Sequence, residues 1–482
     1  MARGHQQLEH LLRRAGFGAS VEDLEAYQDL ALPVVTDLVL DIDDDDDVDR
    51  LIGAPDRVSV TTRGTFAPDT NIEDARQRWL FRMIHARNPV QEKMALFWHN
   101  HFATAYSKVA GFAGARQGAR MMAGKPGAVE GPPGQIELFR QHALGSFRDL
   151  LLAVARDPAM LVWLDGRTNT RQRPQENFAR EIMELFTFGI GNYTEADVYA
   201  AARVFTGWNL QPTGNLRNDG YYEFVFRAAQ HDTADKTFTF PIYRDGSRTI
   251  AARSGDAGMQ DGVDFITALA TQPNTARRLA RRLWAFLVSE TEAPPAGFVD
   301  TAAAIYLQNR TEMKPVVRYV LRSPWFNDPA NAFSRYSWPA EYVVRAVKEI
   351  GWAGYSIDNA RTPLTNMGQT LFEPPDVAGW ALGEAWFSTG AMLARMNFAA
   401  SLAFNQKFNL GRAAQPFAES PERLLEYFLD RLSPSPYDGG PHAELLDYLR
   451  AGEPWTGNEA QVNVKAPGLA RLIAGSAEYQ VI

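Results

Sequence analysis

Apolar residues recur three and four positions apart along most of this chain, which is the spacing that gives an α-helix one buried face. Leu8, Leu11 and Leu12 follow this spacing near the start. With 45% apolar residues among 482, the chain can also fill a large core. The predicted fold class is therefore mainly all-α, a globular multi-helix domain. The spacing predicts helices over 73–86, 89–103, 136–208, 262–290, 298–322 and 339–351.

One glycine-rich stretch interrupts the helical spacing. Residues 107–135 contain several glycines and prolines, which predicts a long flexible loop. No stretch has the composition of a clean linker between domains. We therefore predict one helical domain over residues 1–405 that includes this loop, with residues 406–482 as a C-terminal helical extension packed on it.

A second stretch, residues 219–262, changes to strand-like alternation. The segment YYEFVF (221–226) alternates, and FTFPIY (238–243) resembles a second short strand. A turn sequence follows at Asp245-Gly246. We expect a small β-hairpin insertion around residues 220–245 in an otherwise helical protein.

Charge and missing residue types exclude several classes of protein. A net charge of −8 argues against a nucleic-acid-binding surface, and the basic cluster Arg277, Arg278, Arg281 and Arg282 is expected on the solvated side of an amphipathic helix. The absence of cysteine excludes disulfides and thiolate ligands. The sequence contains no run of 18 apolar residues, so it predicts no membrane span. The N-terminus lacks the apolar core of a signal peptide, which predicts a cytoplasmic protein and leaves open an exported form with a trimmed signal.

Common catalytic cassettes are missing as well. The chain contains no P-loop, no G-x-S-x-G elbow, no G-x-G-x-x-G and no H-E-x-x-H motif. These absences count against the commonest enzyme classes, and the cofactor stays unknown.

The stretch PQENFAREIMELFTFG (174–189) gathers charges on one predicted helix. Glu176, Arg180 and Glu184 are four residues apart, so they can form a ladder of ion pairs on the surface. Each such pair contributes only about 0.3–0.5 kcal/mol. The ladder therefore accounts for three of the four charges without any functional role.

Glu181 has no partner in that ladder. It lies in a second row with Asn177 and Glu184, where two carboxylates face the same way and burial would raise the pKa of a carboxyl group. Arg203, near the end of the next predicted helix, has the reach to meet Glu181 or Glu184. Glu181 is thus the residue that most favours a polar site, and a structural salt bridge with Arg203 is the alternative.

Two histidines lie in MALFWHNHFAT (94–104). His99 and His101 are two residues apart, so on a regular helix they point to different sides and do not chelate one metal ion. The rings converge only if the helix frays after Phe97. The alternative is one hydrogen-bonded core histidine and one exposed histidine.

Further polar candidates follow predicted helices or strands. Asp165, beside Gly166 at the end of an apolar helix, is either a turn residue or a site carboxylate. In QHDTADKTFTF, His231 and Lys236 follow a predicted strand, where loops often carry chemistry and where His-Asp is also an ordinary turn.

Several of these stretches resemble one known family. FWHNHFAT, DPAMLVWLD, ENFAREIMELFTFGIGNYTEADV, AARVFTGW, HDTADKTF and PPDVAGW occur in this order. The chain resembles the large bacterial family of domains of unknown function numbered 1800, from HLLRRAGFG to about residue 402. Gln175 stands where the family pattern has Asn, which keeps an amide. The residues that match the family motifs are His99, Asn100, His101, Asp165, Glu176, Asn177, Arg180, Glu181, Glu184, Thr206, Gly207, Trp208, His231, Asp232, Lys236, Asp376, Trp380 and Arg395.

The resemblance implies an all-helical fold and no established activity. Members of the family are often encoded beside a sulfatase-like protein, which implies such a companion as a partner. Many members resemble exported proteins, and this sequence lacks the export signal that they carry.

We first consider an enzyme. A hydrolase or lyase acting on a carbohydrate-like or anionic substrate would use Glu181 and Glu184 as an acid–base pair, assisted by His99 or His101. Trp208, Trp380 and Trp386 would supply stacking surfaces. The residues expected to bind the substrate are Glu176, Asn177, Arg180, Arg203, Trp208, His231, Lys236, Asp376, Trp380 and Arg395.

Two alternatives use the same residues differently. A metal-dependent enzyme would recruit His99, His101 and His231 together with Asp165 or Glu181. A non-catalytic binding or scaffold protein would bury the polar side chains in a network that fixes helix packing. The two enzyme readings require these side chains to meet in one concave pocket.

Overall fold

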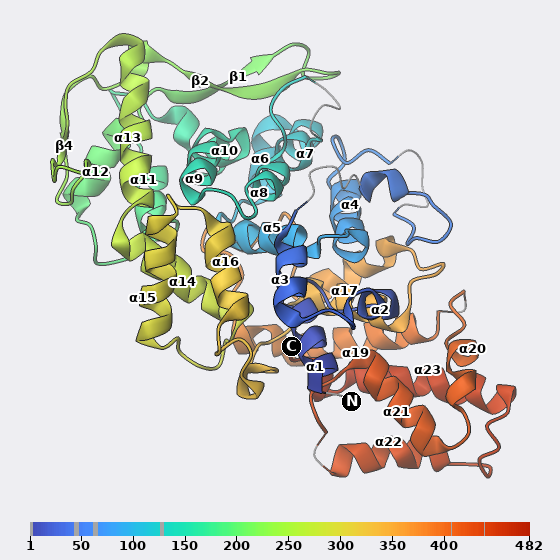
Figure 1. Cartoon of the computed structure of the whole chain (residues 1–482). Helices are drawn as coiled ribbons and strands as arrows, with labels where there is room; N and C mark the ends of the chain where they lie inside the picture. Colours follow the sequence, from blue (N-terminus) through green and yellow to red (C-terminus); the bar gives the residue numbers. More distant parts are fainter. Residues whose placement is uncertain (1–2, 43–47, 61–65, 126–129, 406, 438) are drawn as a thin grey trace.

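A computed structural model describes residues 3–42, 48–60, 66–125, 130–405, 407–437 and 439–482. The described residues form 23 α-helices and four short strands. Figure 1 shows the strands along one edge of the molecule and the C-terminal helices at the opposite corner. The predicted mainly all-α fold class is confirmed. No helix in these ranges is both long enough and apolar enough to cross a membrane.

Two helices form the centre of the core. In α5 (Pro89–His101) and α17 (Pro339–Ile350), nearly every side chain is buried, and a proline occupies the first turn of each. Helices α5 and α4 confirm the predictions for 89–103 and 73–86. The helices packed against α5 are α1 (Arg3–Ala15), α3 (Leu32–Leu40), α4 (Ile72–His85) and α8 (Gln135–Gln141). The helices packed against α17 include α4, α18 (Arg361–Asn366), α19 (Thr389–Ala403) and α21 (Pro421–Leu432).

The prediction of a flexible loop over residues 107–135 is wrong for the first part of this stretch. This part folds into α6 (Tyr106–Ala113) and α7 (Ala115–Ala123), while residues 126–129 lie outside the described ranges. The glycine signal has another cause here. A Cβ on Gly118 would lie 2.9 Å from the Ala110 Cα, so glycine lets the two helices approach closely.

The region predicted as helical over 136–208 is divided into several helices. Its α11 ends at Glu184, and α12 begins with the capping box of Thr194 and Asp197. A ten-residue connection, 185–194, therefore separates two helices that pack against each other. After α8, the helices of this region are α9 (Phe147–Arg156), α10 (Pro158–Trp163), α11 (Glu176–Glu184) and α12 (Glu195–Val204).

The β-hairpin is present, but with a different partner strand from the one predicted. The segment 221–226 forms β2 (Tyr221–Phe226), as expected, and pairs antiparallel with β1 (Trp208–Thr213). The segment 238–243 contributes no strand residue. A separate two-residue pair, β3 (Lys236–Thr237) with β4 (Thr249–Ile250), follows. Gly207, at φ 80°, lies between α12 and β1, where the chain changes from helix to strand. The apolar spacing of the sequence stays helical up to this point and does not reveal the change.

The remaining helices lie near the N-terminus, in the middle of the chain and in its C-terminal part. The C-terminal helices pack on the rest mainly through α23, which contacts α19, and through α21, which contacts α17. A domain boundary at residue 405 stays a prediction. The remaining helices are α2 (Val21–Tyr27), α13 (Met259–Ala270), α14 (Pro273–Leu287), α15 (Ala296–Gln308), α16 (Met313–Arg322), α20 (Leu410–Ala414), α22 (Gly440–Arg450) and α23 (Glu459–Gly475).

Candidate functional site

Both histidines of α5 lie in the core. His99 Nε2 accepts a hydrogen bond from the Phe372 N–H (3.1 Å), and its ring centroid is 5.3 Å from that of Trp380. His101 Nε2 donates to the Phe186 carbonyl (3.0 Å). Burial lowers the pKa of His99 to about 3 and holds the pKa of His101 well below its usual range. Both rings are neutral and contact different neighbours, so the predicted convergence of His99 and His101 on one site is wrong. The alternative, with one of the two histidines exposed, is wrong as well.

The charges of α11 form only part of the predicted ladder. Arg180 contacts Glu195 at 2.7 Å and Glu176 at 3.4 Å. Glu184 instead accepts a hydrogen bond from the Tyr193 hydroxyl. The predicted ion pair of Arg180 with Glu176 is thus confirmed, and the one with Glu184 is wrong. The cause is the chain that follows α11, which brings Tyr193 next to Glu184 and Glu195 next to Arg180.

Glu181 is half-buried beside α11's other polar residues. Burial and the neighbouring Glu184 raise the pKa of Glu181, and its carboxylate makes no hydrogen bond or ion pair with any described residue. One turn earlier, the Asn177 amide donates to Asp165 Oδ2 (3.0 Å), which Lys108 also contacts at 3.3 Å. These side chains form a partly exposed polar row, and none of them has a hydrogen bond to either imidazole.

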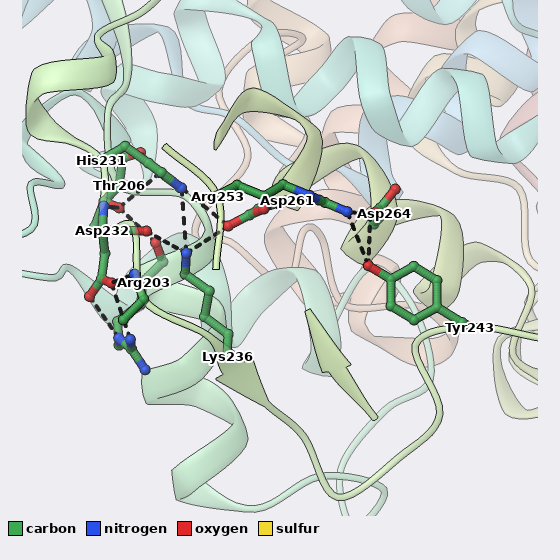
Figure 2. A network of polar contacts seen from close by, with 10 residues as sticks. Arg203, Thr206, His231, Asp232, Lys236, Tyr243, Arg253, Asp261 and Asp264 are labelled. Carbon is green, nitrogen blue, oxygen red and sulfur yellow. Dashed lines mark hydrogen bonds and ion pairs between the residues drawn. The ribbon is translucent and has the colours of Figure 1, made fainter. Parts of the chain in front are cut away.

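Arg203, His231 and Lys236 belong to a buried polar network at the start of α13 (Figure 2). Asp261 accepts hydrogen bonds from Lys236 Nζ (2.6 Å) and Arg253 (3.0 Å), and His231 Nε2 lies 3.2 Å from the same carboxylate. The side chains of His231, Lys236 and Asp261 have no exposed surface. These three side chains are therefore closed to solvent, while Arg203, Asp232 and Arg253 at the edge of the network are partly exposed.

Arg203 enters this network through Asp232. The guanidinium donates to both carboxylate oxygens (2.7 and 3.1 Å), so the predicted pairing of Arg203 with Glu181 or Glu184 is wrong. The cause is the loop after β2, which lies against the end of α12, where the Asp232 N–H donates to Thr206 Oγ1 (2.8 Å). The network thus holds this loop to α12 and α13 (Figure 2).

Three more predicted substrate-binding residues occupy structural positions. Trp208 is buried at the start of β1. Arg395 is buried and donates to the Ser337 carbonyl (2.8 Å). Asp376 is exposed and accepts a hydrogen bond from the Ala378 N–H (2.8 Å), which closes a turn. Their predicted role in substrate binding stays a prediction without support from these contacts.

One cavity joins stretches that carry the family resemblance. It has a volume of about 630 Å³, and we call it the α14 cavity because α14 forms one wall. FWHNHFAT supplies Phe97 and Asn100, the end of the α11 stretch supplies residues 188–190 and 192, and PPDVAGW supplies Ala378 and Trp380. Its lining, within the described chain, contains no carboxylate and no imidazole.

The wall formed by α14 is basic. Arg281 and Arg282 follow Arg278 by three and four residues, so all three line the cavity from one side of the helix. The Arg278 guanidinium donates to the Leu185 carbonyl (3.1 Å), but the guanidinium groups of Arg281 and Arg282 have no ion pair or hydrogen bond with any residue the structure describes. Burial and the neighbouring Arg278 lower the pKa of Arg282 to about 10, so its charge persists at neutral pH. A fully solvated position for this cluster is therefore wrong for Arg278 and Arg282, which are partly buried.

A fixed amide lies beside the basic wall. Asn100 Oδ1 accepts a hydrogen bond from the Trp380 N–H (2.8 Å), which leaves the Nδ2 donor without a partner among the described residues. Gly379, at φ 88°, makes this contact possible, since a Cβ there would lie 2.2 Å from Asn100 Oδ1. The cavity thus offers a neutral amide donor in addition to its guanidinium groups.

The mouth of the cavity is built from two loops. Asn274 Nδ2 donates to Asn192 Oδ1 (2.6 Å), and Asn192 Nδ2 donates to the Phe188 carbonyl (2.8 Å). These bonds fix the 188–192 loop to the start of α14. Ile190 on this loop is 78% exposed, and Leu382 on the other loop is 40% exposed.

The periodicity of the sequence identifies this site only in part. Trp380 is the one predicted substrate-binding residue that lines the cavity, and Asn100 is a matched motif residue. For the arginines, the sequence shows only that helical spacing places them on one side of α14. No group of three or more histidine, aspartate or glutamate side chains that could hold a metal ion occurs in the described ranges. The lining polar residues that the sequence did not predict as site residues are Asn192, Asn274, Arg278, Arg281 and Arg282.

Comparison with known proteins gives one match. No curated protein and no solved structure matches the chain. A family model described as a protein of unknown function, DUF1800, matches residues 10–481. This match extends past residue 402, where the quoted motifs end, and includes the C-terminal helices. The chain therefore belongs to the DUF1800 family of proteins of unknown function.

Proposed function

We propose that this protein binds a small anionic molecule in the α14 cavity. The observation that carries the proposal is a lining with three guanidinium groups and no carboxylate among the described residues. Arg281 and Arg282 have no counter-ion there, and Arg282 is partly buried. A charge withdrawn from water without a partner is costly, so an anion from solution would stabilise this arrangement.

The chemistry of the lining suits an oxyanion. Guanidinium groups donate paired hydrogen bonds that match phosphate, sulfate or carboxylate oxygens. Asn100 Nδ2 adds a neutral donor, while Phe97 and Trp338 provide apolar surface. A cavity of about 630 Å³ lies within the range of small-molecule sites.

The hydrolase or lyase function stays a prediction. Glu181, Glu184, His99 and His101 do not line the cavity, so a reaction there would need a different acid or base. The hydrogen-bonded network around the buried Asp261 supports instead a packing role for much of the predicted polar set. A sulfatase-like companion also stays a prediction.

Isothermal titration calorimetry with inorganic phosphate at low ionic strength tests the proposal. A hydrogen bond to a charged group contributes about 1.5–3 kcal/mol, so Arg282→Gln should weaken binding by roughly tenfold to 150-fold. Arg277→Gln is the matched control, because Arg277 lies on the same helix, outside the cavity, and pairs with Asp300 at 3.1 Å. Equal affinities for the two variants would contradict the proposed site.

A further inference from the structure

The α14 cavity places charge and apolar surface in an unusual order. Arg282, partly buried, lies inside, where its guanidinium is 6.0 Å from the centroid of the Phe97 ring. Ile190 and Leu382 line the same cavity and are exposed at its mouth. A surface adapted only to water would show the opposite order, with charge outside and apolar side chains inside.

The exposure of Ile190 is fixed by its loop. Gly189 and Gly191 have φ near 84°, a backbone conformation that glycine adopts without strain. Asn192 Nδ2 donates to the carbonyls of Phe188 (2.8 Å) and Gly189 (3.2 Å), and Asn192 is in turn held by Asn274. The loop therefore presents Ile190 outward through several hydrogen bonds and a backbone suited to that position.

Apolar side chains continue from the mouth into the cavity. Phe97, Phe286, Trp338 and Trp380 contribute to the lining, in addition to Ile190 and Leu382. A ligand consisting of an anionic group alone would contact the arginines and leave this apolar surface in water. One that combines an anionic head with an apolar chain would cover both.

We infer that the ligand is an anionic amphiphile, with a compact phosphate or carboxylate head against the α14 arginines and an alkyl chain that leaves between Ile190 and Leu382. This inference rests on the proposed anion site and adds the apolar half of the ligand. Each methylene that the cavity buries should tighten binding about fourfold. A chain with three or more buried methylenes therefore binds at least tenfold more tightly than its head group alone.

Three soluble probes separate the two halves of the ligand. Calorimetry compares octyl phosphate, kept below its micelle concentration, with inorganic phosphate and with octanol. We expect octyl phosphate to bind at least tenfold more tightly than either. If octyl phosphate and inorganic phosphate bind equally, the amphiphile inference is wrong and the anion site stands. If neither phosphate binds, the proposed function fails as well.

A matched pair of variants locates the chain. Ile190→Ser should weaken octyl phosphate binding several-fold, and by a larger factor than it weakens inorganic phosphate binding. Leu393→Ser is the control, because Leu393 on α19 is 58% exposed and does not line the cavity. Equal effects of the two substitutions on octyl phosphate would overturn the inference.

Sedimentation with vesicles distinguishes a membrane lipid from a soluble ligand. Vesicles of neutral phosphatidylcholine are compared with vesicles that also contain phosphatidic acid. Selective binding to the second kind, lost in Ile190→Ser, assigns the head group to a lipid. Octyl phosphate binding without vesicle binding assigns it to a soluble amphiphile. Binding to neither octyl phosphate nor these vesicles rejects the inference.

Discussion

Asp261→Asn would remove one negative charge from the buried network of Figure 2 and change the side-chain volume very little. The carboxylate contacts Lys236 Nζ (2.6 Å), Arg253 (3.0 Å) and His231 Nε2 (3.2 Å). Lys236 and Asp261 have no exposed surface, so water does not replace the lost partner. In the variant, the Lys236 ammonium would keep the Asp232 carbonyl as an acceptor but no carboxylate.

The expected loss of stability follows from this geometry. Removing one partner of a buried ion pair costs about 3–5 kcal/mol, because the remaining charge stays buried and uncompensated. The contacts with His231 and Lys236 hold the pKa of Asp261 below its usual range although burial opposes this. For 482 residues, an unfolding entropy of about 2.1 cal/mol/K per residue gives ~1 kcal/mol/K. The melting temperature should therefore fall by about 3–5 °C.

Differential scanning calorimetry measures this shift against a surface control. Asp300 is 61% exposed and pairs with Arg277 at 3.1 Å, so Asp300→Asn should lose less than about 1 kcal/mol. A second substitution, Lys236→Met, added to Asp261→Asn should recover part of the loss by removing the unpaired ammonium. Equal shifts for Asp261→Asn and Asp300→Asn would refute the reasoning.

Two further predictions concern the cavity and the pH dependence of stability. Gly379→Ala should lower the free energy of unfolding by about 2 kcal/mol and weaken phosphate binding, because its Cβ would collide with Asn100. The control is Gly383→Ala, also at positive φ (71°), which should cost only the backbone strain of about 1 kcal/mol because no atom lies closer than 3.9 Å to its Cβ. Urea unfolding compares the stabilities of the two variants, and calorimetry compares their phosphate binding. Burial raises the pKa of Asp157 to about 7. The folded state therefore holds this proton more tightly than the unfolded chain, so stability should fall from about pH 4 to pH 7, and Asp157→Asn should flatten urea-unfolding free energies there by up to about 1.4 kcal/mol per pH unit.

The helices were predictable where apolar spacing coincides with burial. The spacing over 73–86 and 89–103 corresponds to α4 and α5. The spacing fails where glycine serves packing. In α6 and α7, Gly118 permits close approach to Ala110, and its local signal resembles that of a loop. Only the tertiary contact distinguishes the two roles.

The candidate site was less predictable than the fold. On an amphipathic helix, an arginine in solvent and an arginine that lines a cavity occupy the same polar side. The sequence of α14 therefore does not show whether other segments cover its arginines. The covering residues come from the 188–192 and 378–382 loops, far away in the chain. Conversely, His231 and Lys236 have the residue types of a reactive site, but Asp261 and the Asp232 carbonyl enclose them. Long-range contacts decide both cases.

The motif His99-Asn100-His101 gains a physical explanation from these contacts. Successive residues of a helix point about 100° apart, so the three side chains face three directions. His99 accepts from the Phe372 N–H on one side, and His101 donates to the Phe186 carbonyl on another. Two such bonds on different sides fix the rotation of α5 about its axis. Asn100 is thereby held toward the α14 cavity, so the buried imidazoles act as positioning residues for the amide that lines it.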